Sequence, residues 1–129
     1  MKIMYQPSIQ KGTLMKIVSK PWGEERWWAI TPKYVGKILI VKKGHRLSLQ
    51  YHQVKHETQY IEEGTVKLTI GSSPENLEEK IVGAGDAYVL PPGTWHRIEA
   101  LEDAKIFEVS TPEVEDVVRL SDDYGRQEK

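Results

Sequence analysis

The sequence predicts an all-β fold, a barrel or jelly roll built from short strands. Short runs in which apolar and polar residues alternate recur at nearly regular spacing, and this spacing is typical of such folds. The composition agrees, because the 129 residues include ten Gly and seven Pro, which favour tight turns between strands. A chain of this length suits one domain that buries roughly two thirds of its unfolded surface.

The start of the chain precedes this pattern. We interpret residues 1–14 as an N-terminal extension of a single domain over residues 15–129, with Met15 as an alternative start. A second interpretation, which the sequence leaves open, is a strand over Met1–Tyr5 that pairs with a neighbouring subunit. The segment Lys20-Pro21-Trp22-Gly23 predicts a turn, because Pro fixes φ and disfavours helix at the residue before it.

The next strands are expected over residues 27–30 and 37–42, joined by a loop through Pro32. Residues 38–41 are apolar on both faces, which is typical of a strand buried between two layers. Alternation then predicts a strand over residues 46–52. Its apolar side carries Leu47, Leu49 and Tyr51, and its polar side carries Arg46, Ser48, Gln50 and His52.

The second half of the chain continues in the same way. Three further strands are expected, over residues 65–70, 87–90 and 105–110. Residues 71–80 are polar and rich in turn formers, so they predict the tip of a surface hairpin. One short helix is expected over residues 114–120, with Thr111 as its cap and Pro112 in its first turn.

The composition argues against several classes of partner. The formal net charge is −1, so no overall positive field attracts nucleic acid or an acidic membrane surface. No apolar run approaches the ~20 residues that cross a bilayer, and the first ten residues lack the apolar core of a secretory signal. The chain has no cysteine, which excludes disulfides and a thiol nucleophile. We therefore expect a cytoplasmic protein with no nucleic-acid or membrane partner.

Four polar side chains from two stretches offer a metal-binding set. Gln50 and His52 lie two residues apart and point to the same side of one strand, Glu57 follows, and His96 comes directly after a Pro-Pro-Gly turn. Two imidazole nitrogens and two oxygens suit a borderline divalent ion. Glu57 points to the same side only if residues 53–55 contain a turn or bulge. If the first stretch stood alone, an ordinary edge strand with solvated polar side chains would be the alternative.

Both stretches resemble the two motifs of the cupin superfamily. The first motif, G-x5-H-x-H-x(3,4)-E-x6-G, is matched by Gly44, His52, Glu57 and Gly64, with Gln50 at the first His position. The second, G-x5-P-x-G-x2-H-x3-N, is matched by Gly85, Pro91, Gly93 and His96, with Ala100 in place of the Asn. His45 and His56 fall outside the pattern, and we expect them to be solvated.

A narrower resemblance, to the type II phosphomannose isomerases, rests on three segments. They are VKKGHRLSLQYH at 41–52, where a Gln precedes the His in the same way, KPWGEE at 20–25 and EDVVRLSDDYGR at 115–126. In bifunctional relatives this family forms the C-terminal domain of mannose-6-phosphate isomerase/mannose-1-phosphate guanylyltransferase. Together with the two motifs, the resemblance covers residues 20–126.

The resemblance implies a cupin double-stranded β-helix, a jelly-roll barrel, with one divalent metal ion. The ligands would be Gln50, His52, Glu57 and His96. Zn, Mn, Fe, Co and Ni all suit this donor set, so the identity of the metal stays open. The implied reaction is the interconversion of mannose 6-phosphate and fructose 6-phosphate through an enediol(ate), with the ion as Lewis acid. The sequence does not identify the base.

Three cationic residues are candidates for handling the sugar phosphate. The resemblance implies a catalytic role for Arg126 near the sugar-phosphate site; a frayed C-terminal charge is the alternative. Arg46 shares the face of Gln50 and His52, and its planar fork of donors suits a phosphate. Lys67 is a further substrate-binding candidate. The alternative for Arg46 and Lys67 is a solvated charge on a strand.

The sequence leaves two other functions open. A non-catalytic module that binds a sugar or sugar phosphate fits the same fold, because fold alone does not choose the function. A metal-dependent dioxygenase on the same ligands ranks third, since nothing in the chain suggests a pocket for an aromatic or thiol substrate. We also expect a homodimer, with which the apolar side of residues 47–51 is compatible.

Overall fold

The structure is a computed structural model, and it describes residues 7–9, 11–12, 16–113 and 115–126. These residues form eleven strands and no helix. The strands are β1 (Lys16–Lys20), β2 (Gly23–Ile30), β3 (Val35–Val41), β4 (Leu49–Tyr51), β5 (Glu57–Glu63), β6 (Thr65–Ser73), β7 (Asn76–Gly83), β8 (Ala87–Leu90), β9 (Trp95–Ala100), β10 (Ala104–Ser110) and β11 (Val118–Ser121).

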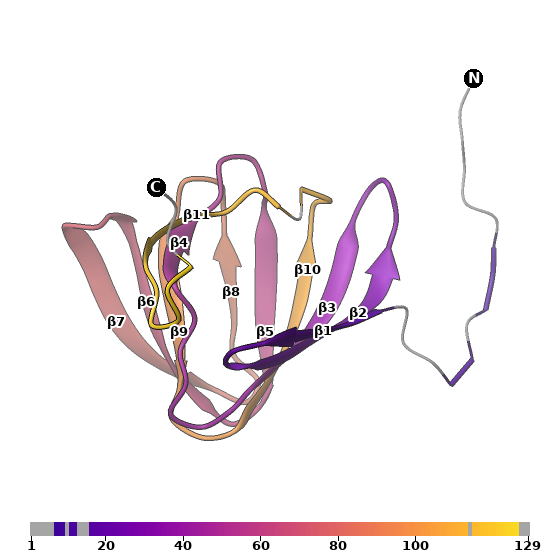
Figure 1. Cartoon of the computed structure of the whole chain (residues 1–129), viewed down its shortest axis with the longest axis horizontal. Coiled ribbons are helices and arrows are strands. Elements are labelled where there is room, and N and C mark those ends of the chain that lie inside the picture. The colour runs from indigo at the N-terminus through magenta and orange to yellow at the C-terminus, as the bar shows by residue number, and fades with distance from the viewer. Residues whose placement is uncertain (1–6, 10, 13–15, 114, 127–129) are drawn as a thin grey trace.

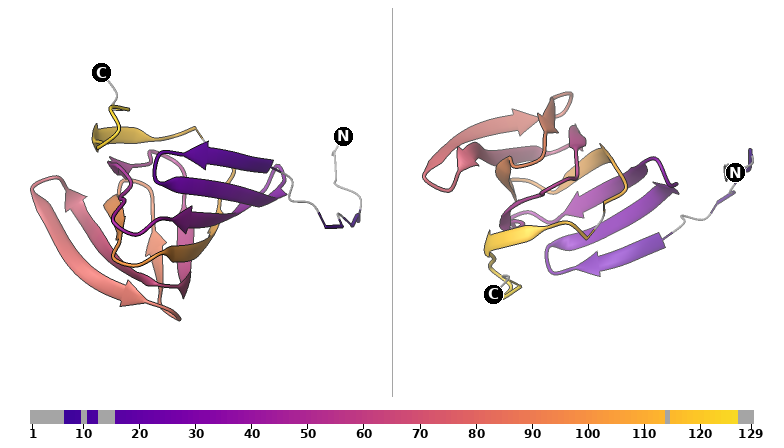
Figure 2. Two further views of the ribbon diagram at one scale, coloured as in Figure 1. Left: turned by 60° about the horizontal axis from the view of Figure 1, so that its bottom comes forward. Right: turned by 90° about the horizontal axis from the view of Figure 1, so that it is seen from above.

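The strands form two antiparallel sheets that curve around a common interior (Figures 1 and 2). One sheet has the order β1-β2-β3-β10-β5-β8, and the other has the order β11-β4-β9-β6-β7. Among consecutive strands, β1–β2, β2–β3 and β6–β7 are hydrogen-bonded neighbours, whereas every other connection between described strands crosses to the other sheet. The predicted all-β barrel is confirmed.

The interior is apolar at one end and polar at the other. On the central strand β10, Ile106 lies opposite Leu39 and Ile61 in a fully buried layer. Two residues further along β10, Glu108 lies opposite Lys37 and Gln59, which are also buried. Alternate residues of a strand face the same side. On each of these three strands, an inward-facing apolar side chain of the core is therefore followed, two residues away, by an inward-facing polar side chain of the cavity.

Gly64, which closes the first motif, has a structural role at the β5–β6 turn. Its φ is +89°, and a Cβ added there would lie 2.4 Å from the backbone oxygen of Asp103. Any other residue would combine left-handed strain with a backbone clash. The motif glycine therefore lets the chain change sheets close to the β9–β10 connection.

The helix expected over residues 114–120 is wrong. Residues 115–117 form a turn and coil, and β11 follows at Val118–Ser121, paired with β4; Val114 lies outside the described residues. The β-branched Val117 and Val118 have weak helix preference, and the open edge of β4 offers backbone hydrogen bonds that a short isolated helix does not.

The polar hairpin tip is much shorter than expected. Only Pro74 and Glu75 form the turn, and the rest of the segment extends β6 and begins β7. β7 is an edge strand, and most of its side chains are exposed. Its run of Glu and Lys therefore lacks the alternation of apolar and polar residues by which a half-buried strand is recognised in a sequence.

Two sequence interpretations concern surfaces at the margins of the fold. Leu47 packs against the core, and Tyr51 packs against Trp95 with ring centroids 4.6 Å apart, so part of the proposed apolar dimer face is already covered within the chain. The predicted extension over residues 1–14 and the alternative strand over Met1–Tyr5 lie mostly or wholly outside the described residues.

Among the described residues no helix is long and apolar enough to cross a membrane.

Candidate metal centre

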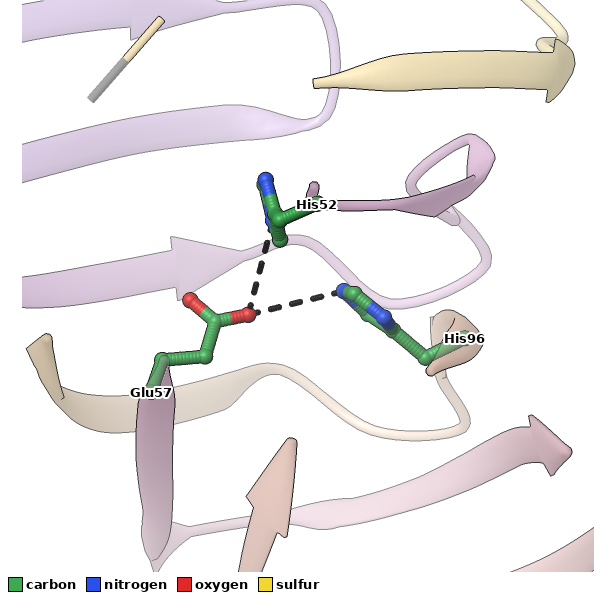
Figure 3. A group of neighbouring side chains, drawn as sticks. All are labelled: His52, Glu57 and His96. Atoms are coloured by element: carbon green, nitrogen blue, oxygen red, sulfur yellow. Dashed lines mark ion pairs between the residues drawn. The ribbon is translucent and has the colours of Figure 1, made fainter. Parts of the chain in front are cut away.

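Three side chains from the two sheets converge at the polar end of the interior (Figure 3). Glu57 begins β5 in the larger sheet, whereas His52 directly follows β4 and His96 lies on β9 in the smaller sheet. One carboxylate oxygen, Glu57 Oε1, lies 3.7 Å from His52 Nε2 and 3.5 Å from His96 Nε2. All three side chains are buried. The arrangement therefore presents three donor atoms to one point inside the barrel.

Backbone hydrogen bonds set the tautomer of both imidazoles. His52 Nδ1 contacts the carbonyl oxygen of Asp116, and His96 Nδ1 lies 3.0 Å from the carbonyl oxygen of Thr94. A carbonyl oxygen only accepts, so each Nδ1 carries the hydrogen and donates it. Each neutral ring then keeps the lone pair of Nε2 toward Glu57, which is the tautomer that a metal ligand needs.

The titration behaviour of the three groups suits a cation between them. Burial, with the nearby positive charge of Lys55, lowers the pKa of His52; burial also lowers the pKa of His96 to about 4. Both imidazoles are therefore neutral near pH 7. Burial and the neighbouring Glu108 carboxylate raise the pKa of Glu57. A positive ion at this point would stabilise the Glu57 carboxylate, so the charges of the site fit a metal.

The spacing of the donor atoms also fits an ion. Ligand bonds of ~2.1 Å give distances between neighbouring ligand atoms of about 3.0 Å in an octahedron and about 3.4 Å in a tetrahedron. The observed 3.5 Å and 3.7 Å lie just above the tetrahedral value. The two distances to Glu57 Oε1 are therefore close to those around a divalent ion, and all three ligand atoms lie within 4.8 Å of one another.

Gln50, the fourth predicted ligand, stands beside this group. It lies directly opposite His96 in the β4–β9 pairing, and its Nε2 is 3.5 Å from His96 Nε2. Its Oε1 accepts a hydrogen bond from the hydroxyl of Ser48 at 2.7 Å. The amide nitrogen, not the oxygen, therefore faces the other ligands. Rotating the amide by half a turn would exchange the two atoms, because the Ser48 hydroxyl can also accept.

A carboxylate from the C-terminal segment holds the loop between His52 and Glu57. Asp116 Oδ1 accepts from the N–H of Gln53 at 3.1 Å, and Oδ2 accepts from the N–H groups of Val54 and Lys55 at 2.6 Å and 2.9 Å. These bonds fix the turn that the sequence requires for Glu57 to point inward. The carbonyl group of the same residue accepts from His52. Asp116 thus positions His52 and the loop that leads to Glu57.

Replacing Asp116 with alanine is expected to weaken metal binding by about 10- to 100-fold, the usual effect of losing a residue that orients ligands. The three N–H groups of the 53–55 loop lose their acceptor, so Glu57 is less well placed. Competition with a chromophoric chelator measures the affinity. Asp123→Ala is the matched control, because Asp123 lies on the same segment but pairs with Arg46. Equal affinity of the Asp116→Ala variant and the wild type would contradict this role.

A second set of polar side chains lies behind Glu57. Lys55 Nζ is 3.0 Å from Glu57 Oε2 and 3.2 Å from Glu108 Oε2, and Gln59 Nε2 donates to Glu108 Oε1 at 2.9 Å. Burial opposes ionisation of Glu108, but Lys55, Lys37 and Gln59 outweigh it and lower its pKa. Lys55 therefore bridges two buried carboxylates and leaves Glu57 Oε1 for the centre.

Sequence reasoning did not identify this second set, although a signal was present. Each polar residue lies two positions from a buried apolar residue of the same strand and therefore on the same face. The pairs are Gln59 and Ile61 on β5, Glu108 and Ile106 on β10, and Lys37 and Leu39 on β3. A polar residue that continues a buried period-two row points into the interior. Lys55 gave no such signal, because it lies in the irregular loop.

A cavity of about 110 Å³ opens from the centre. Arg126 lines it, and Asp122 holds the guanidinium through hydrogen bonds of 3.0 Å from Nε and 3.0 Å from Nη2. Arg46 and Lys67 are not among the lining residues. Arg46 pairs with Asp123 on the outside, and Lys67 lies 3.5 Å from a Glu99 oxygen and 3.7 Å from a Glu79 oxygen. Substrate binding by Arg46 and Lys67 stays a prediction, and this placement does not favour it.

The two remaining histidines are exposed, as expected. His45 stacks on Tyr124 with ring centroids 6.5 Å apart. The backbone N–H of His56 donates to the hydroxyl of Thr111 at 3.0 Å, and its carbonyl oxygen accepts from the Thr111 N–H at 3.0 Å. Neither belongs to the group of potential ligands found among the described residues.

The fold and the centre define a β-barrel protein with a candidate metal site inside the barrel. Residues 37–110 match the model of the cupin domain, and the chain belongs to this family. The family resemblance seen in the sequence is confirmed.

The relatives found by sequence are longer proteins. The chain is 32% identical over 114 residues to the mannose-1-phosphate guanylyltransferase ManC of Salmonella typhimurium, covering 84% of this chain and 23% of that protein. It is 29% identical over 121 residues to the xanthan biosynthesis protein XanB of Xanthomonas campestris, covering 90% of this chain and 25% of that protein. The chain thus spans about a quarter of the length of these relatives.

Solved structures share the fold. An RmlC-like cupin from Shewanella frigidimarina has a TM-score of 0.71 at 17% identity, covering 86% of this chain and 96% of that chain. The oxalate decarboxylase of Bacillus subtilis, which has Mn(II) centres, has a TM-score of 0.70 at 19% identity, covering 82% of this chain and 30% of that chain. At these identities the likeness concerns the fold.

Proposed function

We propose that this chain is a metal-dependent isomerase of sugar phosphates that interconverts mannose 6-phosphate and fructose 6-phosphate. The observation that carries the proposal is the meeting of His52, Glu57 and His96 in a cavity whose other walls are rich in cationic side chains. The first feature suits a divalent ion, and the second suits an anionic substrate. The relatives that act on mannose 1-phosphate, as their names state, support a sugar phosphate as the substrate class.

The role proposed for each residue follows from its position in the cavity. His52, Glu57 and His96 would hold the ion, with Lys55 and Asp116 fixing the direction of Glu57 and His52. The bound ion supplies Lewis-acid stabilisation for negative charge that develops on substrate oxygens during proton transfer between neighbouring carbons. Arg126 would hold the substrate from the cavity wall, and the buried surroundings would exclude bulk water, so that these electrostatic effects act at full strength.

A coupled assay tests this function. The purified protein is loaded with Zn²⁺, Mn²⁺, Co²⁺, Ni²⁺ or Fe²⁺ and supplied with mannose 6-phosphate, and fructose 6-phosphate is measured before and after treatment with a chelator. Turnover that the chelator abolishes is expected. Binding of mannose 6-phosphate without turnover would replace the isomerase by a sugar-phosphate binding module. Oxygen consumption with another substrate would instead support a dioxygenase.

The cytoplasmic location and the homodimer stay predictions from the sequence. Size-exclusion chromatography with light scattering measures the oligomeric state directly, and a monomeric mass would contradict the dimer.

A further inference from the structure

Six of the twelve large apolar side chains that are exposed among the described residues lie on one surface, the outer face of the larger sheet. Lys37, Glu108 and Gln59 point into the cavity from β3, β10 and β5, so the residues next to them along each strand point outward. The six side chains are between 38% and 60% exposed. We call them the outer apolar face, and they are Ile17, Trp28, Tyr60, Val89, Phe107 and Val109.

The strand register makes this face continuous over the middle of the sheet. Phe107 on β10 lies opposite Tyr60 on β5, and their ring centroids are 6.3 Å apart. Two residues further along β10, Val109 lies opposite Thr58, which in turn lies opposite Val89 on β8. The two rows are neighbours on the same side of the sheet, so their aromatic and β-branched side chains form one patch.

Trp28 extends the patch to β2 by lying over a glycine of β3. A Cβ added to Gly36 would lie 2.7 Å from Trp28 Cζ2, so a larger residue at this position would displace the indole ring. Gly36 lies opposite Val109 in the β3–β10 pairing, which places the ring beside the second row. Trp28 is nevertheless 49% exposed. Its ring is thus held against the backbone and still offers a surface, as aromatic anchors of interfaces do.

Ile17 takes the face to the edge strand β1. It lies opposite Arg26 on β2. The neighbours of Arg26 along the chain, Glu25 and Trp27, line the cavity, so Arg26 and Ile17 point to the outer side. The outer apolar face therefore crosses the sheet from β1 to β8.

The charged side chains beside this face are paired within the chain. Arg26 Nε lies 2.6 Å from Glu24 Oε2, and Lys105 Nζ lies 3.5 Å from Glu63 Oε1. The border of the face therefore carries both signs, and it offers no single-sign field to a nucleic acid or an acidic surface. An apolar centre that is poor in charge and rich in aromatic side chains is typical of interfaces between copies of one chain.

The described part of the N-terminal segment does not cover this face. Residues 7–9 and 11–12 are exposed and lie away from the strands (Figure 1). The apolar side of residues 47–51, which the sequence suggested for a dimer, is partly packed within the chain. The outer apolar face is therefore the better candidate for a contact with another molecule.

The area of the face suits a second copy of the chain. A large apolar side chain has about 150–250 Å² of surface, so six that are each about half exposed present about 500–600 Å². Two such faces packed together would bury about 1,000–1,200 Å², which reaches the size of a specific interface. Two sheets can pack in this way about 10 Å apart, with the side chains of their facing surfaces interdigitated.

We propose that the outer apolar face joins two copies of this chain, sheet against sheet, about a two-fold axis. A closed two-fold contact uses the same patch on both copies, which is the commonest arrangement of homo-oligomers. The interface lies on a different face from residues 47–51, and it does not rest on the proposed isomerase. Because its area is at the lower end for specific interfaces, the dimer dissociates reversibly, in the micromolar range.

Sedimentation velocity over a range of protein concentrations measures the dissociation constant of the dimer. Phe107→Glu and Tyr60→Glu are each expected to raise it at least about 100-fold, because the contact would bury an unpaired carboxylate in the middle of the patch. Ile81→Glu is the matched control, since Ile81 is 62% exposed but lies on β7 of the smaller sheet. The thermal midpoint of the wild type should also rise with protein concentration, and that of Phe107→Glu should not.

The outcomes separate the possible occupants of the face. A wild type that stays monomeric at every concentration would overturn the proposal, and so would a monomer that floats with vesicles of uncharged phosphatidylcholine, because a lipid surface would then cover the face. A dimer that Phe107→Glu and Tyr60→Glu leave intact would place the contact elsewhere and would overturn it as well. Val89→Glu, on the edge strand β8, provides the answer if neither of these variants folds. None of these measurements involves turnover of mannose 6-phosphate, so failure of the interface and failure of the isomerase are distinct results.

Discussion

The His96→Ala protein is expected to contain almost no metal and to have lost at least about a thousandfold in kcat, since the bound ion supplies several kcal/mol of transition-state stabilisation. His96 provides one of two imidazole nitrogens, 3.5 Å from Glu57 Oε1, and its lone pair is fixed by the bond to Thr94. Without it, His52 and Glu57 are the remaining members of the described group. These two ligands, even with the weaker amide oxygen of Gln50 beside them, fall short of the predicted set of four and hold an ion less tightly.

Elemental analysis of purified protein measures this effect, with about one divalent ion per chain expected for the wild type. His56→Ala is the matched control, because it removes the same kind of side chain from an exposed position outside the cavity. The thermal midpoint of both variants, measured after chelation, separates loss of the ion from loss of the fold. A His96→Ala protein that keeps its ion and its turnover would refute the ligand assignment.

The candidate ligands could be predicted from the sequence because their positions follow local spacing. Gln50 and His52 share a strand face by parity, and the glycines at 44 and 64 mark the turns that bound the motif. The inward direction of the Glu57 side chain could be predicted only if residues 53–55 were assumed to form a turn or bulge. The acceptor that holds this turn, Asp116, is more than sixty residues away along the chain, and no pattern within the loop indicates it.

The cationic side chains near the cavity show the same limit. Arg46 shares strand parity with Gln50, yet it pairs with Asp123 on the outside, because the regular strand begins only at Leu49. Lys20 and Arg119 lie on strands that are far apart in sequence, and only the meeting of two sheet edges brings them to one cavity. Side-chain direction along a strand is thus local information, whereas closure of a barrel is not.

The Lys55→Met variant is expected to lose about 3–5 kcal/mol of unfolding free energy in the metal-free state, the usual effect of removing one partner from a buried ion pair. Lys55 is buried and lies within 3.0 Å of Glu57 and 3.2 Å of Glu108. Methionine has similar length and no charge, so the two carboxylates would share the interior without a cation between them. Burial and Glu108 already raise the pKa of Glu57 in the presence of Lys55.

Urea denaturation of chelator-treated protein measures the loss. Lys105→Met removes a partly exposed cation that lies 3.5 Å from Glu63, and it should change the stability by no more than about 1 kcal/mol. Adding Glu108→Gln to Lys55→Met leaves a single buried carboxylate, so part of the lost stability should return. If Lys55→Met alone were as stable as the wild type, Lys55 would not be the counter-charge of the interior.

The same variant also tests the place of the metal ion. A divalent ion held by Glu57 would supply positive charge next to the carboxylate that has lost Lys55. The ion should therefore bind Lys55→Met more tightly than the wild type, and at the same metal concentration it should stabilise the variant more. Because Lys55 contacts Oε2 and the histidines face Oε1, both cations can act on Glu57 at once. Equal dissociation constants, and hence equal stabilisation by metal, would mean that the ion and Lys55 do not share the charge of Glu57.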